Sequence, residues 1–387
     1  MSPGRARLLV MIPQAPPFGG VAAQASLLLS SRAFERSFEQ IVIRTNTIRR
    51  LENPERKKLD LRSAAGAAKL ALATAGAVLA GGYDAVYCTA NGDLSFPWVV
   101  SCALHAARLR RCPLILHVHA SRSGFWEWQK QLASGLPVRV SRLRSALSRA
   151  GDRLCAAQSR KADRIVHLTK GIDEHYGALG WRRADAIVPN GTRIPAQIAG
   201  GRPGPGELLF LGRLSREKGF FDLLEALSGP VPGDWRLHVA GSVPAGEDPA
   251  SVESALAAGG IRDRVLLHGL VTGSAKSALL SACSVLVHPT HRDVFPMSVV
   301  EAMASGMAVV ACAKGEIPSM PAEGGWIEAA PGDPSSLRKA ILRLLEDPAA
   351  AASMGEANRK KAMEEYEVEA NSARIASLIL TAVEERR

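Results

Sequence analysis

Two basic side chains, Arg213 and Lys218, lie close together in a segment that follows a predicted strand at 208–212. An arginine guanidinium binds phosphate through two parallel hydrogen bonds, and a lysine ammonium adds a compact positive charge. On one loop the two side chains can reach the same diphosphate. We therefore interpret them as a diphosphate-binding pair. The neighbouring Arg216 and Glu217 are expected to form a solvated ion pair.

A second loop contains a predicted helix start. Pro296 suits the first helical position, because its φ is already helical and it has no N–H to leave unpaired. The amides of Met297, Ser298 and Val299 then lack intrahelical acceptors and favour an anion or a hydroxyl group. We expect this helix start to cradle part of a ligand.

Two carboxylates belong to the same segment. Glu301 falls one helical turn further along, among small and apolar residues, where a carboxylate needs a partner. Two ribose hydroxyls, held by the two carboxylate oxygens, would supply one, and a structural salt bridge is the alternative. Asp293 precedes the helix and is interpreted as part of the same site.

Adjacent glycines, Gly19 and Gly20, follow a predicted strand at 8–13. Without side chains they let the backbone approach a phosphate or a sugar closely, and the helix start there favours an anion. A tight strand-to-helix turn is the alternative. The segment lacks the full spacing of a dinucleotide-binding loop, so a nicotinamide or flavin site is not expected.

Two histidines, His117 and His119, end the predicted strand at 114–119. Alternation along a strand places both imidazoles on one face, with His119 nearer the carboxyl end. We predict a hydrogen bond from one imidazole to a sugar hydroxyl, and the alternative is that both are structural. No cysteine or carboxylate cluster lies nearby in the sequence, so a metal site is not expected.

These loops interrupt an alternation of apolar strands and helical segments, which is the pattern of βαβ units and parallel sheets. The 387 residues, 47% hydrophobic and 22% charged, suffice for two globular domains. The predicted strands are 8–13, 41–45, 85–89, 114–119, 165–169 and 187–189 in one sheet, and 208–212, 235–240, 265–269, 284–288, 308–311 and 326–329 in another.

The glycine- and proline-rich stretch 196–206 predicts a linker between the two sheets. We expect one doubly wound domain at 1–195, a second at 207–366, and an amphipathic C-terminal helix at 367–387. Doubly wound sheets bind ligands at the carboxyl ends of their strands, which is where the loops described above lie.

The formal net charge of +11 indicates an anionic partner. Arranged as a helix, residues 136–160 place four arginines in one stripe: Arg142, Arg149, Arg153 and Arg160. Such a helix can dock on anionic lipid headgroups. A solvated helix that packs its leucines on the sheet is an equally good interpretation.

The six cysteines occur singly, as expected of buried thiols in a reducing compartment. The apolar run 8–12 is too short for the core of a secretory signal, and we expect a buried strand there. Residues 64–82 are mostly alanine and glycine and include Lys69, so a packed helix is expected instead of a membrane span.

In this order and on these loops, the motifs resemble those of the family 4 nucleotide-sugar glycosyltransferases, which have the GT-B fold. The resemblance covers nearly the whole chain and rests on Pro17-Phe18-Gly19-Gly20, His119, Val188-Pro189-Asn190-Gly191, Gly212-Arg213-Leu214-Ser215-Arg216-Glu217-Lys218-Gly219 and Asp293…Glu301-Ala302-Met303-Ala304-Ser305-Gly306. It implies an α/β fold of two Rossmann-like doubly wound domains that face each other across a cleft. The domain at 1–195 would bind the acceptor, that at 207–366 the nucleotide-sugar, and the C-terminal helix would cross back to the N-terminal domain.

The resemblance also implies roles for the residues of the C-terminal half. Arg213 and Lys218 would neutralise the donor diphosphate and stabilise the departing nucleotide, and Glu301 would hold the ribose. Asp293 and the backbone around the helix start would hold the donor sugar. The residues of that helix start are Phe295, Pro296, Met297 and Ser298.

In the N-terminal half, Gly19 and Gly20 would approach the donor phosphate and the acceptor, and His119 would contact the sugar. One departure concerns Asp293, because the family usually has glutamate at that position. Aspartate is one methylene shorter, so the sugar contact and the choice of donor sugar can differ.

By resemblance, the chain would be a retaining hexosyltransferase that uses a GDP- or UDP-linked sugar and a saccharide or lipid-linked saccharide acceptor in bacterial-type polysaccharide or glycolipid synthesis. No D-x-D motif occurs, so neither a metal nor a cofactor is expected, and Arg213, Lys218 and helix N-termini would meet the leaving-group charge. The acceptor hydroxyl would attack the donor sugar on the same face from which the nucleotide departs. The departing phosphate would act as the base. We expect a cytoplasmic protein, with an anionic membrane surface as a candidate partner.

Three other functional classes are compatible with part of the sequence. A nucleic-acid binder would explain the charge but not the motifs, and no nucleic-acid module is present, so no nucleic-acid partner is expected. An epimerase of the same fold would need more acid–base groups than His119 and Asp293. A non-catalytic sugar-nucleotide-binding protein is compatible with Asp293. The nucleobase, sugar, acceptor, linkage and oligomeric state stay open.

Overall fold

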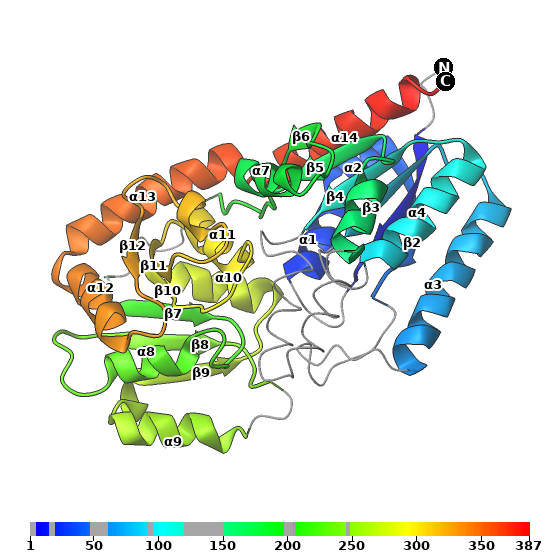
Figure 1. The fold of residues 1–387 in the computed structure, drawn as a ribbon. Coiled ribbons are helices and arrows are strands. Elements are labelled where there is room, and N and C mark those ends of the chain that lie inside the picture. The colour runs from blue at the N-terminus through cyan, green and yellow to red at the C-terminus, as the bar shows by residue number, and fades with distance from the viewer. Residues whose placement is uncertain are drawn as a thin grey trace. The chain divides into compact units, whose positions relative to one another are not determined.

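The computed structural model describes residues 5–14, 20–46, 61–90, 96–119, 150–196, 204, 206–244 and 248–387. The chain divides into two compact units (Figure 1). The N-terminal unit comprises Met1–Asn190 and Val368–Arg387, and the C-terminal unit comprises Gly191–Glu367. Most of the predicted linker at 196–206 lies outside the described residues.

The N-terminal unit is built on a six-stranded parallel sheet with the order β2-β1-β3-β4-β5-β6. Its strands are β1 Ala6–Ile12, β2 Phe38–Arg44, β3 Ala85–Ala90, β4 Leu114–Val118, β5 Arg164–His167 and β6 Ala186–Ile187. In the centre of the sheet, β3 and β4 are buried along their whole length. This explains why their sequences are almost continuously apolar and do not alternate between apolar and polar residues.

The helices of this unit are α1 Gly20–Leu29, α2 Arg32–Ser37, α3 Leu61–Ala80, α4 Phe96–Arg110, α7 Lys170–Ala178 and α14 Val368–Glu384, and residues 150–159 are also helical. α14 contacts α1, α2 and β3, and it buries Ile375 and Ile379 in the core beside Leu8 and Phe34. The last helix of the chain therefore belongs to the first sheet, as predicted.

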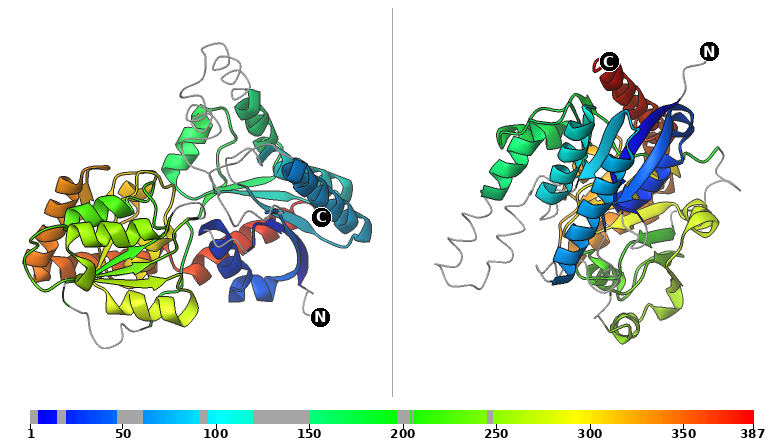
Figure 2. Two further views of the ribbon diagram at one scale, coloured as in Figure 1. Left: turned by 90° about the horizontal axis from the view of Figure 1, so that it is seen from below. Right: turned by 90° about the vertical axis from the view of Figure 1, so that its right-hand side faces the viewer.

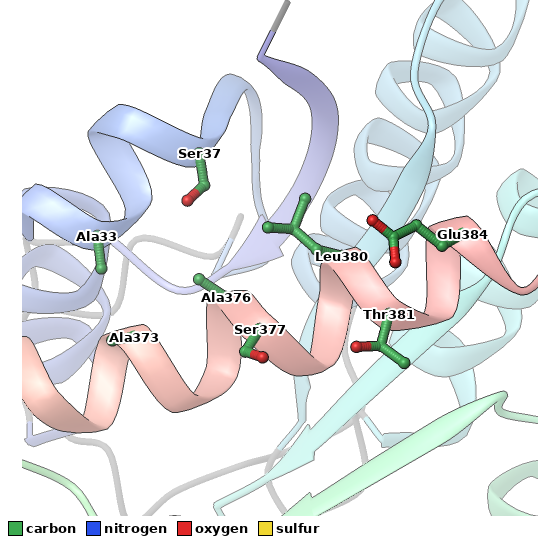
Figure 3. Close-up of a pocket in the computed structure, with 8 residues that line it drawn as sticks. All are labelled: Ala33, Ser37, Ala373, Ala376, Ser377, Leu380, Thr381 and Glu384. Carbon is green, nitrogen blue, oxygen red and sulfur yellow. The ribbon is translucent and has the colours of Figure 1, made fainter. Parts of the chain in front are cut away.

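Where α14 meets α2, the two helices leave a small hollow of about 390 Å³ (Figure 3). It is lined by Ala33, Ser37, Ala373, Ala376, Ser377, Leu380, Thr381 and Glu384. Most of these side chains are short, so the hollow follows from the packing of small residues between two helices.

The C-terminal unit has a second six-stranded parallel sheet, with the order β12-β11-β10-β7-β8-β9. Its strands are β7 Glu207–Leu211, β8 Arg236–Ala240, β9 Val265–Gly269, β10 Val285–His288, β11 Ala308–Cys312 and β12 Trp326–Ala329. Its helices are α8 Phe220–Leu227, α9 Ala250–Gly259, α10 Gly273–Ala282, α11 Met297–Ala304, α12 Pro334–Glu346 and α13 Pro348–Glu365. Short 3₁₀ turns lie at Arg262–Arg264 and Ile317–Ser319.

The chain leaves β7 toward β8 on one side and later returns to form β10 on the other side. The loops that follow β7 and β10 therefore diverge at the switch point of the sheet, where doubly wound folds bind ligands. The predicted class, two Rossmann-like doubly wound sheets with a C-terminal helix on the first, is confirmed. All predicted strands are present, with most ends shifted by a residue or two.

Residues 64–82, predicted to form a packed helix, coincide with most of α3. Among the helices that the structure describes, none has the length and apolar character needed to cross a bilayer. Of the predicted arginine stripe, Arg142 and Arg149 lie outside the described residues. Arg160 donates to the carbonyl of Gly180, so this side chain is engaged within the protein.

Candidate functional site

The loops after β7 and β10 are joined at close range in the C-terminal unit. Gly219, which precedes α8, has φ = +68°, and a Cβ there would lie 2.0 Å from the carbonyl oxygen of Pro289. Only glycine fits such an approach. The amide of His291 also donates to the carbonyl of Glu217 at 2.9 Å. The predicted basic loop and the predicted carboxylate loop are thus held together by backbone contacts.

Asp293 connects these two loops through its side chain. Its Oδ2 accepts from Lys218 Nζ at 2.6 Å and from His288 Nε2 at 3.1 Å. Its Oδ1 accepts from the amide of Val294 at 2.9 Å. Both carboxylate oxygens are therefore bound to protein groups, and Lys218 is fixed at the carboxyl end of β7.

The charge state of Asp293 follows from these partners. Burial alone would raise the pKa of its carboxyl. The hydrogen bond from His288 and the positive charge of Lys218 outweigh burial and hold the pKa well below its usual range. Asp293 is thus ionised at neutral pH. Sequence reasoning missed His288, although its position at the end of β10 is the kind of signal that singled out His119.

Arg213 lies on the same loop as Lys218 but has a different partner. Its Nη2 is 3.6 Å from Glu217 Oε2. The guanidinium of Arg216 instead lies 5.2 Å from the centre of the Phe221 ring. The ion pair predicted between Arg216 and Glu217 was wrong in its basic partner, because the apolar ring next to the loop offers Arg216 a cation–π contact.

The start of α11 differs slightly from the prediction. Pro296 is the N-cap residue, with φ −69° and ψ 119°, and Met297 is the first helical residue. The amides of Val299 and Val300 both donate to the Pro296 carbonyl, at 3.1 and 3.4 Å. Placing Pro296 inside the helix and leaving the Val299 amide unpaired was therefore wrong, because the helix begins with a tight turn. Only Met297 and Ser298 keep amides that no intrahelical acceptor can reach.

Phe295 contributes through its position in the core. Its side chain is buried and packs edge-on against the ring of Tyr366, with centroids 6.0 Å apart. The ring thereby anchors the segment between Asp293 and α11. Any ligand contact at Phe295 must then come from its backbone.

Glu301 of α11 has a partner that the sequence did not reveal. Its Oε1 accepts from Lys276 Nζ of α10 at 2.6 Å, and its side chain is only 12% exposed. The bond engages one carboxylate oxygen and leaves Oε2 for another donor. Lys276 is the single charged residue of α10, and that isolation is the signal that could have identified it.

In the N-terminal unit, Gly20 opens α1, and Gly19 lies outside the described residues. His119 follows β4 directly and is buried, with its ring 4.2 Å from that of His117. Burial lowers the pKa of His119 to about 4, so its imidazole is neutral at pH 7. In the part of the chain that the structure describes, neither of its ring nitrogens has a hydrogen-bond partner.

His117 has a structural contact: its Nδ1 lies 2.7 Å from the hydroxyl of Tyr87. Of the two histidines, His119 is therefore the one for which neither ring nitrogen has a hydrogen-bond partner among the described residues. Among the described residues, no group of three or more His, Cys, Asp or Glu side chains is placed to hold a metal ion.

The sequence of the C-terminal unit is similar to that of a known family. Residues 197–361 match the family model described as "Glycosyl transferases group 1". The chain is 25% identical over 292 residues to a 2-deoxystreptamine glucosyltransferase of Streptomyces kanamyceticus, covering 70% of this chain and 71% of that one. It is 27% identical over 296 residues to a glycogen synthase of Mycobacterium tuberculosis, covering 74% of this chain and 67% of that one.

Solved structures share the fold. A sucrose-phosphate synthase from Thermosynechococcus elongatus superposes with a TM-score of 0.74 at 17% identity, over 98% of this chain and 100% of that one. HepE of Anabaena, solved in complex with UDP, gives a TM-score of 0.66 at 18% identity, over 97% and 100% of the two chains.

The contacts of Asp293 predict a pH-dependent contribution to stability. Because the pKa of Asp293 is lowered by folding, its ionised form stabilises the protein above the unfolded pKa of about 4, and this contribution is lost as the pH falls toward the folded value. We expect Asp293→Asn to lower the free energy of unfolding at pH 7 by about 1–3 kcal/mol. Urea unfolding at several pH values should show the difference from wild type shrinking below about pH 4.

Asp263, an exposed aspartate of the same unit, supplies a matched control. Asp263→Asn should leave the free energy of unfolding close to that of the wild type throughout. A difference for Asp293→Asn that stays constant down to acid pH would contradict the proposed ionised state.

Proposed function

We propose that this chain, a glycosyltransferase of the GT-B fold, transfers a hexosyl residue from a GDP- or UDP-linked donor to a saccharide or lipid-linked saccharide acceptor. We further propose that the reaction retains the anomeric configuration and needs no metal, in bacterial-type polysaccharide or glycolipid synthesis. The proposal is supported by the similarity to a glucosyltransferase and a glycogen synthase. It is also supported by the similarity in fold to Anabaena HepE, which was solved in complex with UDP and with UDP-glucose. The observation that carries it is the Lys218–Asp293 pair at the switch point of the C-terminal sheet.

In this proposal Lys218 binds the donor diphosphate. An ammonium has three N–H donors. One reaches Asp293 Oδ2, and a second points to the carbonyl of Arg292 at 3.4 Å. The third is left for a phosphate oxygen. Arg213, whose side chain is 33% exposed, adds a second cation on the same loop.

Asp293 would act mainly by positioning Lys218. The family resemblance implies a sugar contact at this position, where glutamate is usual. Here the shorter aspartate gives both oxygens to Lys218, His288 and the amide of Val294. A sugar hydroxyl would have to bind an oxygen that already accepts from one of these donors. We therefore assign the sugar contact to the amides of Met297 and Ser298 at the start of α11.

Glu301 and Lys276 would recognise the ribose together. The ammonium of Lys276 orients the carboxylate and leaves Glu301 Oε2 as the acceptor for a ribose hydroxyl. The ammonium keeps further N–H donors, which can reach the oxygen of the same hydroxyl or its neighbour. The salt bridge and the ribose contact are therefore compatible, because the salt bridge engages only one oxygen of the Glu301 carboxylate.

The chemical step would depend on charge compensation. As the bond from the sugar to the diphosphate breaks, negative charge grows on the leaving oxygen, and Lys218 and Arg213 stabilise that charge without reorganising. The departing phosphate would accept the proton of the acceptor hydroxyl, which attacks the same face of an oxocarbenium-like centre. His119, neutral at pH 7, can exchange a hydrogen bond with a sugar hydroxyl, and Gly20 would let the backbone approach.

Nucleotide binding without metal tests the donor site. In the presence of a chelator, UDP or GDP at about 100 times its dissociation constant should stabilise the wild type by about 2.7 kcal/mol, and a thermal shift should report this. Glu301→Ala should abolish most of the shift. Glu346→Ala, which removes an exposed glutamate of α12, should leave it unchanged. The donor site would be refuted if no nucleotide or nucleotide-sugar shifted the wild type.

Lys276 gives a sharper prediction about the ribose. Titration calorimetry should show that the wild type prefers the bound nucleotide over its 2′-deoxy form. Lys276→Met should reduce that preference by about tenfold, because one charged hydrogen-bond partner of the site is lost. Lys339→Met, an exposed lysine of α12, is the control. An unchanged preference with lowered thermal stability would show that the Lys276–Glu301 pair only joins two helices.

A further inference from the structure

The helices α3 and α4 pack side by side in the N-terminal unit. Figure 2 shows α3 in blue beside α4 in cyan. The indole of Trp98, near the start of α4, donates to the carbonyl of Ala67 on α3 at 3.1 Å. Thr74 of α3 is buried, and its hydroxyl donates to the carbonyl of Leu70 in the same helix at 2.8 Å. The two helices thus present one joined surface.

That surface exposes large apolar side chains. Leu72 and Leu79 of α3 are 73% and 87% exposed, and Leu109 of α4 is 68% exposed. The spacing of seven residues places Leu72 and Leu79 on the same side of α3. Between them the exposed residues are alanine and glycine, so water meets an almost unbroken apolar stripe. Exposed apolar stripes of this kind mark interaction sites.

The charged residues of the two helices have one sign. Neither α3 nor α4 contains an aspartate or a glutamate. Lys69 lies one turn before Leu72, and Arg108 and Arg110 flank Leu109, all three being exposed. A partner for this surface must therefore be apolar within and anionic at its boundary. A second copy of the chain would bring the same basic residues against each other, which opposes self-association.

We propose that this surface docks on an anionic lipid bilayer. We call it the α3–α4 face and define it by Lys69, Leu72, Leu79, Trp98, Arg108 and Leu109. The leucines would enter the boundary of the acyl chains, the basic residues would meet the phosphate groups, and Trp98 would lie at the headgroup level, where amphipathic rings are favoured. The proposal rests on the proposed function in one respect, because docking brings the enzyme to a lipid-linked acceptor.

Vesicle flotation tests the proposal with the full-length protein. At low salt, the wild type should float with vesicles of equimolar phosphatidylcholine and phosphatidylglycerol and stay behind with phosphatidylcholine alone. The double variant Leu72→Glu/Leu79→Glu should bind the anionic vesicles at least about tenfold more weakly. Met363→Glu, which places one such negative charge at a 56% exposed site on α13, should float like the wild type.

Two further measurements keep the outcomes separate. Thermal shifts with the nucleotide should be the same for both variants and the wild type, which verifies folding. If the wild type bound no nucleotide, the proposed function would be contradicted. The flotation result would still decide whether the α3–α4 face binds anionic lipid. The docking proposal is overturned if the wild type does not bind anionic vesicles or if the double variant binds them equally well. It is also overturned if light scattering shows that the same leucines hold a dimer together.

Discussion

The bond between Lys218 and Asp293 is the interaction on which the rest of the site depends. A basic residue from the loop after β7 and an acidic residue from the loop after β10 meet at 2.6 Å, with His288 on the same carboxylate oxygen. Removing one member of a pair that is so little exposed leaves an uncompensated charge, which destabilises the fold. The two loops must therefore keep their relative position, and the arrangement that we propose for diphosphate binding is formed without a ligand.

The surrounding backbone also fixes the relative position of the two loops. Gly219 allows the two loops to touch, and a side chain there would collide with Pro289. Gly315 plays a similar part on the far side, since its φ is +57° and a Cβ would lie 2.3 Å from the carbonyl oxygen of Asp293. The amide of Glu316 then donates to the Val294 carbonyl at 2.8 Å. The segment that contains Asp293 is thus held from both sides by positions where only glycine fits.

The sequence predicted the fold because its signals are local. Runs such as Leu8–Ile12 are apolar at every position, as central parallel strands must be, and the glycine and proline between them limit each strand. The loops of the site could be found for the same reason, since each follows such a strand. The residue types on these loops suggested a diphosphate contact for Arg213 and a ribose contact for Glu301, and the family resemblance implies the same two roles, which stay predictions.

The missed features depend on contacts between distant segments. Lys276 meets Glu301 across two helices, and no pattern within α10 specifies that partner. The partner of Glu217 proved to be Arg213, because the position of the Phe221 ring decides where Arg216 points. The α3–α4 face could not be predicted either, because the sequence of an alanine-rich helix does not show which of its leucines are exposed.

Titration calorimetry with a nucleoside monophosphate and the matching diphosphate tests the central claim most directly. If Asp293 positions Lys218 for the diphosphate, the wild type should bind the diphosphate much more tightly, and Lys218→Met and Asp293→Asn should both lose most of that advantage. Lys339→Met should keep it. The account is contradicted if Asp293→Asn keeps the full advantage of the diphosphate and loses only the preference for the sugar-linked nucleotide, because Asp293 would then bind the sugar and not position the lysine.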